Sequence, residues 1–168
     1  IMNFNFTFLG NVTIGPKARF KLPEILDANG YENVILVIDH NLREVDIFAD
    51  FIFRIEKFIK KEILCDISEP NYEKLEQKRE EIKNLHVDAF IGIGGGSAID
   101  MAKGLAVLYS NDEPALNYRG FEKFSEPIPP IIAIPTTAGT GSEITPNASF
   151  IDTIEKRKMG INGEAIRP

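Results

Sequence analysis

Two segments rich in glycine and hydroxyl side chains most constrain the fold of this chain, because each directly follows a short apolar run. The first spans residues 92–100 and reads GIGGGSAID, and the second spans residues 135–143 and reads PTTAGTGSE. A buried strand followed by such a loop is typical of an open α/β sheet, in which the carboxyl ends of parallel strands bind phosphate-bearing ligands. The two segments together predict a nucleotide-cofactor site.

Composition limits the classes of protein to consider. The chain has 168 residues, 43% of them hydrophobic and 26% charged, as expected for one globular domain with its own core. Its net charge of −6 gives no general attraction to nucleic acid or to an anionic membrane, so neither is expected as a partner. A single cysteine, Cys65, and apolar runs well short of the roughly 18 residues of a membrane span favour a cytoplasmic protein.

Apolar patterns typical of strands and helices alternate along the chain. Strands are predicted at residues 34–38, 62–67, 87–93, 131–134 and 148–151, and helices at 20–26, 48–59, 72–85 and 98–109. The charged helix at 72–85 is expected to present a solvated face. This alternation predicts an α/β fold, with a Rossmann-like, mostly parallel sheet and helices on both faces.

Two further segments stand outside that alternation. Three phenylalanines alternate with polar residues over positions 4–8, and apolar residues resume at 12 and 14 after a turn at Gly10. This pattern predicts an N-terminal β-hairpin, which could extend a sheet or use its aromatic face to meet a partner such as a second copy in a homodimer. The proline-containing connection at 111–130 is expected to be a mobile surface loop.

The first glycine-rich segment has the chemistry of a phosphate-binding turn. Gly94, Gly95 and Gly96 carry no Cβ, so the backbone can come within hydrogen-bonding distance of a pyrophosphate. Ser97 is predicted to cap the helix that follows, with Asp100 three residues later. A tight strand-to-helix turn without a ligand would need the same residues. The segment matches neither the usual dinucleotide fingerprint nor the phosphate loop of NTPases.

Asp39 suggests which dinucleotide is bound. It ends the apolar run at 34–38, where a carboxylate can accept hydrogen bonds from an adenosine ribose and repel a 2′-phosphate. NAD is therefore favoured over NADP. The alternative is that Asp39 only caps the turn into residues 40–42.

The second segment offers hydroxyl donors beside glycines that allow close backbone approach. Thr136, Thr137, Thr140 and Ser142 supply the hydroxyl groups. The residues from Thr140 to Glu143 also fit a helix capping box, which is a purely structural role.

Together these motifs resemble the N-terminal half of an iron-dependent, or group III, alcohol dehydrogenase. The resemblance rests on GGGSAIDMAK at 94–103 followed by PTTAGTGSE at 135–143, and it extends to Asp39, to EPN at 69–71 and to EKRK at 155–158. It therefore covers nearly the whole chain. It implies that residues 1–168 form a dinucleotide-binding domain. The residues implied in cofactor binding are Asp39 at the adenosine ribose, Asn71 beside the cofactor, Gly95, Gly96 and Ser97 at the pyrophosphate, Asp100 near the nicotinamide half, Thr136, Thr137 and Thr140 across the cleft, and Lys158.

The resemblance also implies a divalent metal ion, iron or zinc, which polarises the oxygen of a small alcohol or aldehyde substrate while hydride passes to or from nicotinamide. Such enzymes hold the metal with an aspartate and three histidines of a following helical domain. This chain has only His40 and His86, whose spacing suits no metal pair. Because it begins Ile1-Met2 and stops at Arg167-Pro168, we expect a piece of a longer protein that is inactive alone.

Two alternatives remain open on the sequence. One is the NAD-binding domain of a dehydroquinate synthase-like sugar-phosphate cyclase, although the sequence at 138–143 favours the dehydrogenase. The other is a non-catalytic nucleotide-binding module.

Overall fold

The central sheet of the protein is entirely parallel. The computed structural model describes residues 10–66 and 70–168. Four strands lie in the order β2-β1-β3-β5, and each pairs in parallel with its neighbour. Their bounds are β1 Val34–Asp39, β2 Ile59–Cys65, β3 Ala89–Gly94 and β5 Ile131–Pro135. The predicted Rossmann-like, mostly parallel sheet is confirmed.

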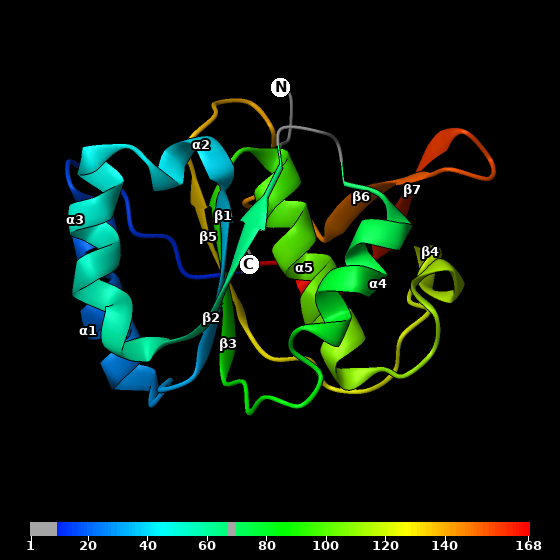
Figure 1. Cartoon of the computed structure of the whole chain (residues 1–168), viewed down its shortest axis with the longest axis horizontal. Helices are drawn as coiled ribbons and strands as arrows, with labels where there is room; N and C mark the ends of the chain where they lie inside the picture. Colours follow the sequence, from blue (N-terminus) through cyan, green and yellow to red (C-terminus); the bar gives the residue numbers. More distant parts are fainter. Residues whose placement is uncertain (1–9, 67–69) are drawn as a thin grey trace, which may run out of the picture.

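Helices cover both faces of this sheet, as predicted (Figure 1). Helices α1 (Leu22–Asn29) and α3 (Asp46–Ile55) lie on one side, and α5 (Gly96–Ser110) and α4 (Tyr72–Glu80) on the other. Strand β1 is buried on both faces, because Leu36 and Ile38 pack with α1 and α3 while Ile35 and Val37 pack with α5. The sheet therefore has a separate hydrophobic core on each face.

A second, smaller sheet lies beyond α5 and was not foreseen. In it β6 (Asn147–Asp152) pairs antiparallel with β7 (Arg157–Asn162), and β4 (Gly120–Phe121) pairs in parallel with β7. The strand predicted at 148–151 is thus real, but it belongs to this sheet. Strand β7 escaped prediction because Ile161 is its only buried apolar residue, so its sequence shows no alternation.

The helix predicted at 48–59 is too long. Helix α3 ends at Ile55, a 3-10 turn covers Glu56–Phe58, and Ile59 begins β2 rather than ending the helix. Phe58 is buried from within the turn, so the apolar spacing continues past the point where the helix stops. Apolar periodicity reports burial and cannot by itself locate the end of a helix.

The remaining short elements connect these layers. A 3-10 turn at Ala18–Lys21 leads into α1, which ends at Asn29 and is followed by Gly30 as its C-cap, with φ of 69°. Helix α2 (His40–Arg43) follows β1, and a 3-10 turn at Glu164–Ile166 precedes the C-terminus. Residues 11–14 lie in no strand, and the first half of the expected N-terminal hairpin lies outside the described residues.

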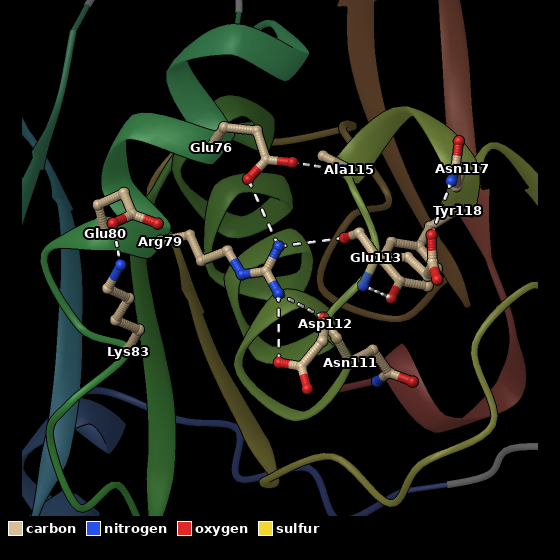
Figure 2. Close-up of polar contacts among 10 residues, drawn as sticks. All are labelled: Glu76, Arg79, Glu80, Lys83, Asn111, Asp112, Glu113, Ala115, Asn117 and Tyr118. Atoms are coloured by element: carbon tan, nitrogen blue, oxygen red, sulfur yellow. Dashed lines mark hydrogen bonds and ion pairs between the residues drawn. The ribbon is translucent and has the colours of Figure 1, made fainter.

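Helix α4 is less solvated than its charge predicts. The side chain of Arg79 is only 13% exposed, and it donates hydrogen bonds to the carbonyl oxygens of Asn111 and Glu113 at 2.9 and 3.1 Å (Figure 2). Glu76, one turn earlier on α4, accepts a hydrogen bond from the amide of Ala115. These contacts fix the chain where it leaves α5.

The expectation of a surface loop at 111–130 is therefore wrong for its first part. Residues Ala115–Tyr118 form a 3-10 turn, and both Ala115 and Tyr118 are buried. Asn111 is buried as well, and its side-chain oxygen accepts from the amides of Ser125 and Glu126. Side-chain hydrogen bonds to the backbone hold this segment in place between its short regular elements.

Within residues 10–66 and 70–168, no helix is both long and apolar enough to cross a membrane.

Gly104 in the middle of α5 is expected to be essential for packing. A Cβ there would lie 2.6 Å from Cζ of Phe150 on β6 and 3.0 Å from Leu75 on α4. We expect Gly104→Val to lower the free energy of unfolding by about 2 kcal/mol, because overpacking outweighs the gain in helix propensity. Urea denaturation measures this change. The matched control Ser110→Val, at a half-buried position of the same helix, should differ from wild type by less than about 0.5 kcal/mol.

Candidate functional site

A cavity of about 540 Å³ opens where α5 begins, at the carboxyl edge of the central sheet. Its wall consists of polar and small residues from α5, from the loop after β5, and from both strands of the β6–β7 hairpin. The lining residues are Pro70, Gly96, Ser97, Asp100, Thr140, Ser142, Thr145, Asn147, Ser149 and Lys158. The cavity therefore lies between the central sheet and the second, smaller sheet.

The glycine-rich turn brings backbone amides to this cavity. Gly94 has φ of +148°, and a Cβ there would lie 2.9 Å from Cβ of Ala98 and 3.1 Å from Cβ of Asp39, so only glycine fits. Gly95 is the N-cap of α5 and has no side chain that could accept hydrogen bonds from the first amides of the helix. The first amides of a helix have no intrahelical acceptor. Here the first two residues of the helix, Gly96 and Ser97, line the cavity.

The expected role of Ser97 as the helix cap is wrong. Helix α5 begins at Gly96, one residue earlier, so Ser97 lies within its first turn. The sequence contains a good capping residue, but the bend at Gly94 starts the helix before it. The side chain of Ser97 lines the cavity instead.

The two predicted loops face each other across the start of α5. A Cβ on Gly95 would lie 3.2 Å from Oγ1 of Thr137, and one on Gly96 would lie 3.2 Å from Oγ of Ser142. A larger residue at either glycine would thus press on the second loop and narrow the gap between the two.

The helix capping box considered for the second loop does not form, because Thr140 and Glu143 bond each other through their side chains and no helix follows. Oγ1 of Thr140 accepts from the amide of Ser142 at 3.3 Å and donates to Oε2 of Glu143 at 3.0 Å. Gly139 and Gly141 have φ of 84° and 73°, a backbone path that no right-handed helix follows. A turn therefore replaces the helix, and the side chain of Thr140 lines the cavity.

Asp100 presents a buried carboxylate to the cavity. Its side chain is 7% exposed, and Oδ2 accepts a hydrogen bond from the amide of Ser149 at 3.0 Å. Oδ1 is buried without a hydrogen-bond partner among the described residues. Burial raises the pKa of this carboxyl group, although the Ser149 amide and the nearby Lys103 oppose the rise. Such an unsatisfied buried acceptor is suited to a donor from a ligand.

Lys103 lies one turn further along α5 and has no solvent exposure. Its Nζ donates to the carbonyl oxygens of Thr145 and Asn147 at 2.7 and 2.9 Å. Burial lowers its pKa to about 8, and the carboxylates of Asp100 and Glu143 partly offset that effect. Sequence reasoning included Lys103 in its motif but not in the site; the available signal was a lysine within an otherwise apolar helix.

Asp39 and Asn71 both act as helix caps. Oδ1 of Asp39 accepts from the amide of Asn41 at 2.9 Å at the start of α2, so the alternative role as a cap is real. Its contact with a ribose stays a prediction. Oδ1 of Asn71 accepts from the amide of Lys74 at 2.8 Å at the start of α4, next to Pro70 in the cavity wall.

The structure gathers part of the predicted site into one place. Those that line the cavity are Gly96, Ser97, Asp100, Thr140 and Lys158. Gly95 precedes the lining residue Gly96, Thr137 lies on the side of Gly95 where a Cβ would point, and Asp39 lies in the same way beside Gly94. Thr136 lines a different cavity, of about 620 Å³, next to α1. Sequence reasoning missed Thr145, Asn147 and Ser149, because nothing in the sequence places β6 beside α5.

A metal site does not fit the described part of the chain. No group of three or more histidine, cysteine, aspartate or glutamate side chains converges among those residues. Nε2 of His86 lies 3.1 Å from a carboxylate oxygen of Asp88 at the surface. Burial, followed by the charges of Asp39 and Asp66, raises the pKa of the Cys65 thiol to about 11, so this cysteine is a poor nucleophile or ligand.

Comparison with known proteins gives a consistent result. The sequence model of the iron-containing alcohol dehydrogenase family matches residues 10–168. Alcohol dehydrogenase 4 of Schizosaccharomyces pombe is 36% identical over 135 residues, which are 79% of this chain and 32% of that protein. The 1,3-propanediol dehydrogenase of Citrobacter freundii is 30% identical over 151 residues, or 88% of this chain and 39% of that protein. The chain thus spans about a third of the length of these relatives.

A solved structure shows the same arrangement. The sulfoacetaldehyde reductase from Bifidobacterium kashiwanohense, crystallised in complex with NAD+, matches with a TM-score of 0.84 and 25% identity. The match covers 99% of this chain and 45% of that one.

The buried Lys103 is expected to make stability depend on pH. Its pKa is about 8 in the folded protein, against 10.5 for a lysine exposed to water. Between these values the unfolded chain binds more protons, so the free energy of unfolding rises with pH. Relative to Lys103→Met, wild type should gain up to about 3 kcal/mol from pH 8 to 10.5. Urea denaturation of both proteins across this range measures the difference, and a constant difference would contradict the prediction.

Proposed function

Because this chain belongs to the iron-containing alcohol dehydrogenase family, we propose that the cavity at the start of α5 binds the diphosphate of a nicotinamide dinucleotide. The observation that carries the proposal is the cavity itself, in which the first amides of a 15-residue helix meet a wall of hydroxyl groups. A phosphate held by amides and hydroxyls suits a chain whose net charge is −6.

The proposal gives roles to several residues that line the cavity and to residues next to them in the chain. Gly95, Gly96 and Ser97 hold the diphosphate through backbone amides, and Thr140 adds a hydroxyl donor from the opposite loop. Lys158 brings a cation to the cavity from β7. Thr136 and Thr137 extend that loop, and Asn71 lies beside the cofactor next to Pro70.

Asp100 is proposed to orient the nicotinamide half. The unpaired Oδ1 supplies an acceptor for a donor group of the ligand, while Oδ2 is held by the amide of Ser149. When bound, the nicotinamide ring supplies the hydride acceptor or donor for an alcohol or aldehyde. Because Asp100 is itself largely shielded from water, a polar contact to its carboxylate is strengthened.

We further propose that residues 1–168 are the dinucleotide-binding domain of a larger enzyme and have no alcohol dehydrogenase activity alone. The iron or zinc ion of the full enzyme would have ligands from another domain, because the described residues offer no cluster that fits it. The proposed substrate is a small alcohol or aldehyde. The family match favours this function over a sugar-phosphate cyclase or a non-catalytic module. A cytoplasmic setting, suggested by one buried thiol, and a homodimer are also proposals.

The preference for NAD is predicted to depend on Asp39. We expect wild type to bind NADH at least about tenfold more tightly than NADPH, because the carboxylate repels a 2′-phosphate. Asp39→Asn keeps an acceptor for the cap of α2 but removes the charge, so the ratio should fall below about threefold. Titration of cofactor fluorescence measures both constants. The control Asp112→Asn removes an exposed carboxylate at the far end of α5 and should leave the ratio unchanged.

Close approach of the cofactor is predicted to require Gly96. A side chain there would point at Oγ of Ser142 and fill the gap between the two loops. We expect NADH affinity to fall about threefold in Gly96→Ala and more than about tenfold in Gly96→Val, a loss on the scale of one charged hydrogen bond. Fluorescence titration and a thermal melt of each variant test this series. Unchanged affinity in a folded Gly96→Val protein would place the diphosphate elsewhere.

A further inference from the structure

Lys103 lies directly behind the wall of the cavity. Its Nζ donates hydrogen bonds to the carbonyl oxygens of Thr145 and Asn147, and both of these residues line the cavity. Side chains on a helix lean toward its N-terminus, so the ammonium group is displaced from its own Cα toward Gly96. A fully buried positive charge is therefore hydrogen-bonded directly to two residues that line the proposed diphosphate site.

The charges that face Lys103 come from three segments. Asp100 on α5 and Glu143 in the second loop favour the protonated amine, whereas Arg167 near the C-terminus disfavours it. Arg167 is itself paired with Glu164 at 3.0 Å. Burial outweighs the two carboxylates and brings the pKa of Lys103 to about 8. The amine therefore changes charge just above neutral pH.

We propose that Lys103 is a positioning residue that couples dinucleotide binding to proton uptake, because the arriving diphosphate holds a proton on its buried amine. This inference rests on the proposed function. A bound cofactor adds negative charge nearby but removes no further water from a side chain that already has no exposure. Its net effect is therefore electrostatic attraction across a region of low dielectric constant.

The redox state of the cofactor should change the size of this effect. NADH and NAD+ share the same diphosphate, but the oxidised nicotinamide ring carries a positive charge that opposes protonation of a nearby amine. Asp100, proposed to face that ring, lies one helical turn from Lys103 on the same helix. NADH should therefore draw more protons onto the protein than NAD+ does.

Isothermal titration calorimetry of this chain at pH 8.5, in two buffers of different ionisation enthalpy, counts the protons taken up. For a rise of one pKa unit from about 8, NADH should take up roughly half a proton per molecule bound, and NAD+ less. The affinity for NADH should then fall about three- to tenfold between pH 7.5 and 9.5, since one unit corresponds to tenfold.

Two substitutions assign the proton to Lys103. Lys103→Arg keeps a positive charge that does not titrate in this range, and Lys103→Met removes the charge. In both, proton uptake at pH 8.5 should vanish and the affinity for NADH should become flat from pH 7.5 to 9.5. The control Lys83→Met changes an exposed lysine that follows the C-terminal end of α4 and pairs with Glu80, and it should behave as wild type.

The outcomes separate this inference from the proposed function. Absence of NADH binding by wild type at pH 7.5 would overturn both. NADH binding without proton uptake by wild type overturns the role of Lys103 alone, and that result needs no variant to fold. Proton uptake that persists in a folded Lys103→Arg or Lys103→Met protein likewise overturns it.

Discussion

The close packing of α5 on the central sheet is the constraint on which the rest of the structure depends. Every residue from Ala98 to Leu108 is buried, because the helix lies between the parallel sheet and the β6–β7 hairpin. Contact on both sides requires small residues. A Cβ on Gly92 of β3 would lie 3.0 Å from the backbone of Ile99, and one on Gly104 would overlap Phe150 of β6. Glycines thus allow the close packing of α5 against both sheets, in addition to the turn that precedes this helix.

The same packing decides the electrostatics of the site. Because α5 is buried, its polar residues Asp100 and Lys103 are buried with it, and each is held by backbone groups of the 145–149 segment. An acceptor and a cation are thereby placed along the helix whose N-terminal amides open to the cavity. This arrangement supplies local binding groups in a protein of net charge −6.

Much of the fold could be predicted from the sequence, because burial on both faces of a parallel strand leaves a continuous apolar run such as 34–38. The failures occur where one signal has two physical meanings. The apolar spacing that reaches Ile59 suits a helix, but that residue begins a strand. Ser97 suits a cap, but Gly94 bends the chain so that α5 starts at Gly96. Asn111 is a residue typical of surface loops, but its side chain is buried and accepts hydrogen bonds from two backbone amides.

The sequence by itself determined the order of the central strands and of the helices that cover them, the two glycine-rich turns and the family, because these depend on residues close together in the chain. Only the tertiary structure decided which polar groups share the cavity. Ser149 meets Asp100, and Asn147 meets Lys103, because the second sheet packs against α5, a contact between segments more than forty residues apart. Local sequence patterns do not predict such contacts, because the contacts form only when apolar surfaces distant in sequence are buried together.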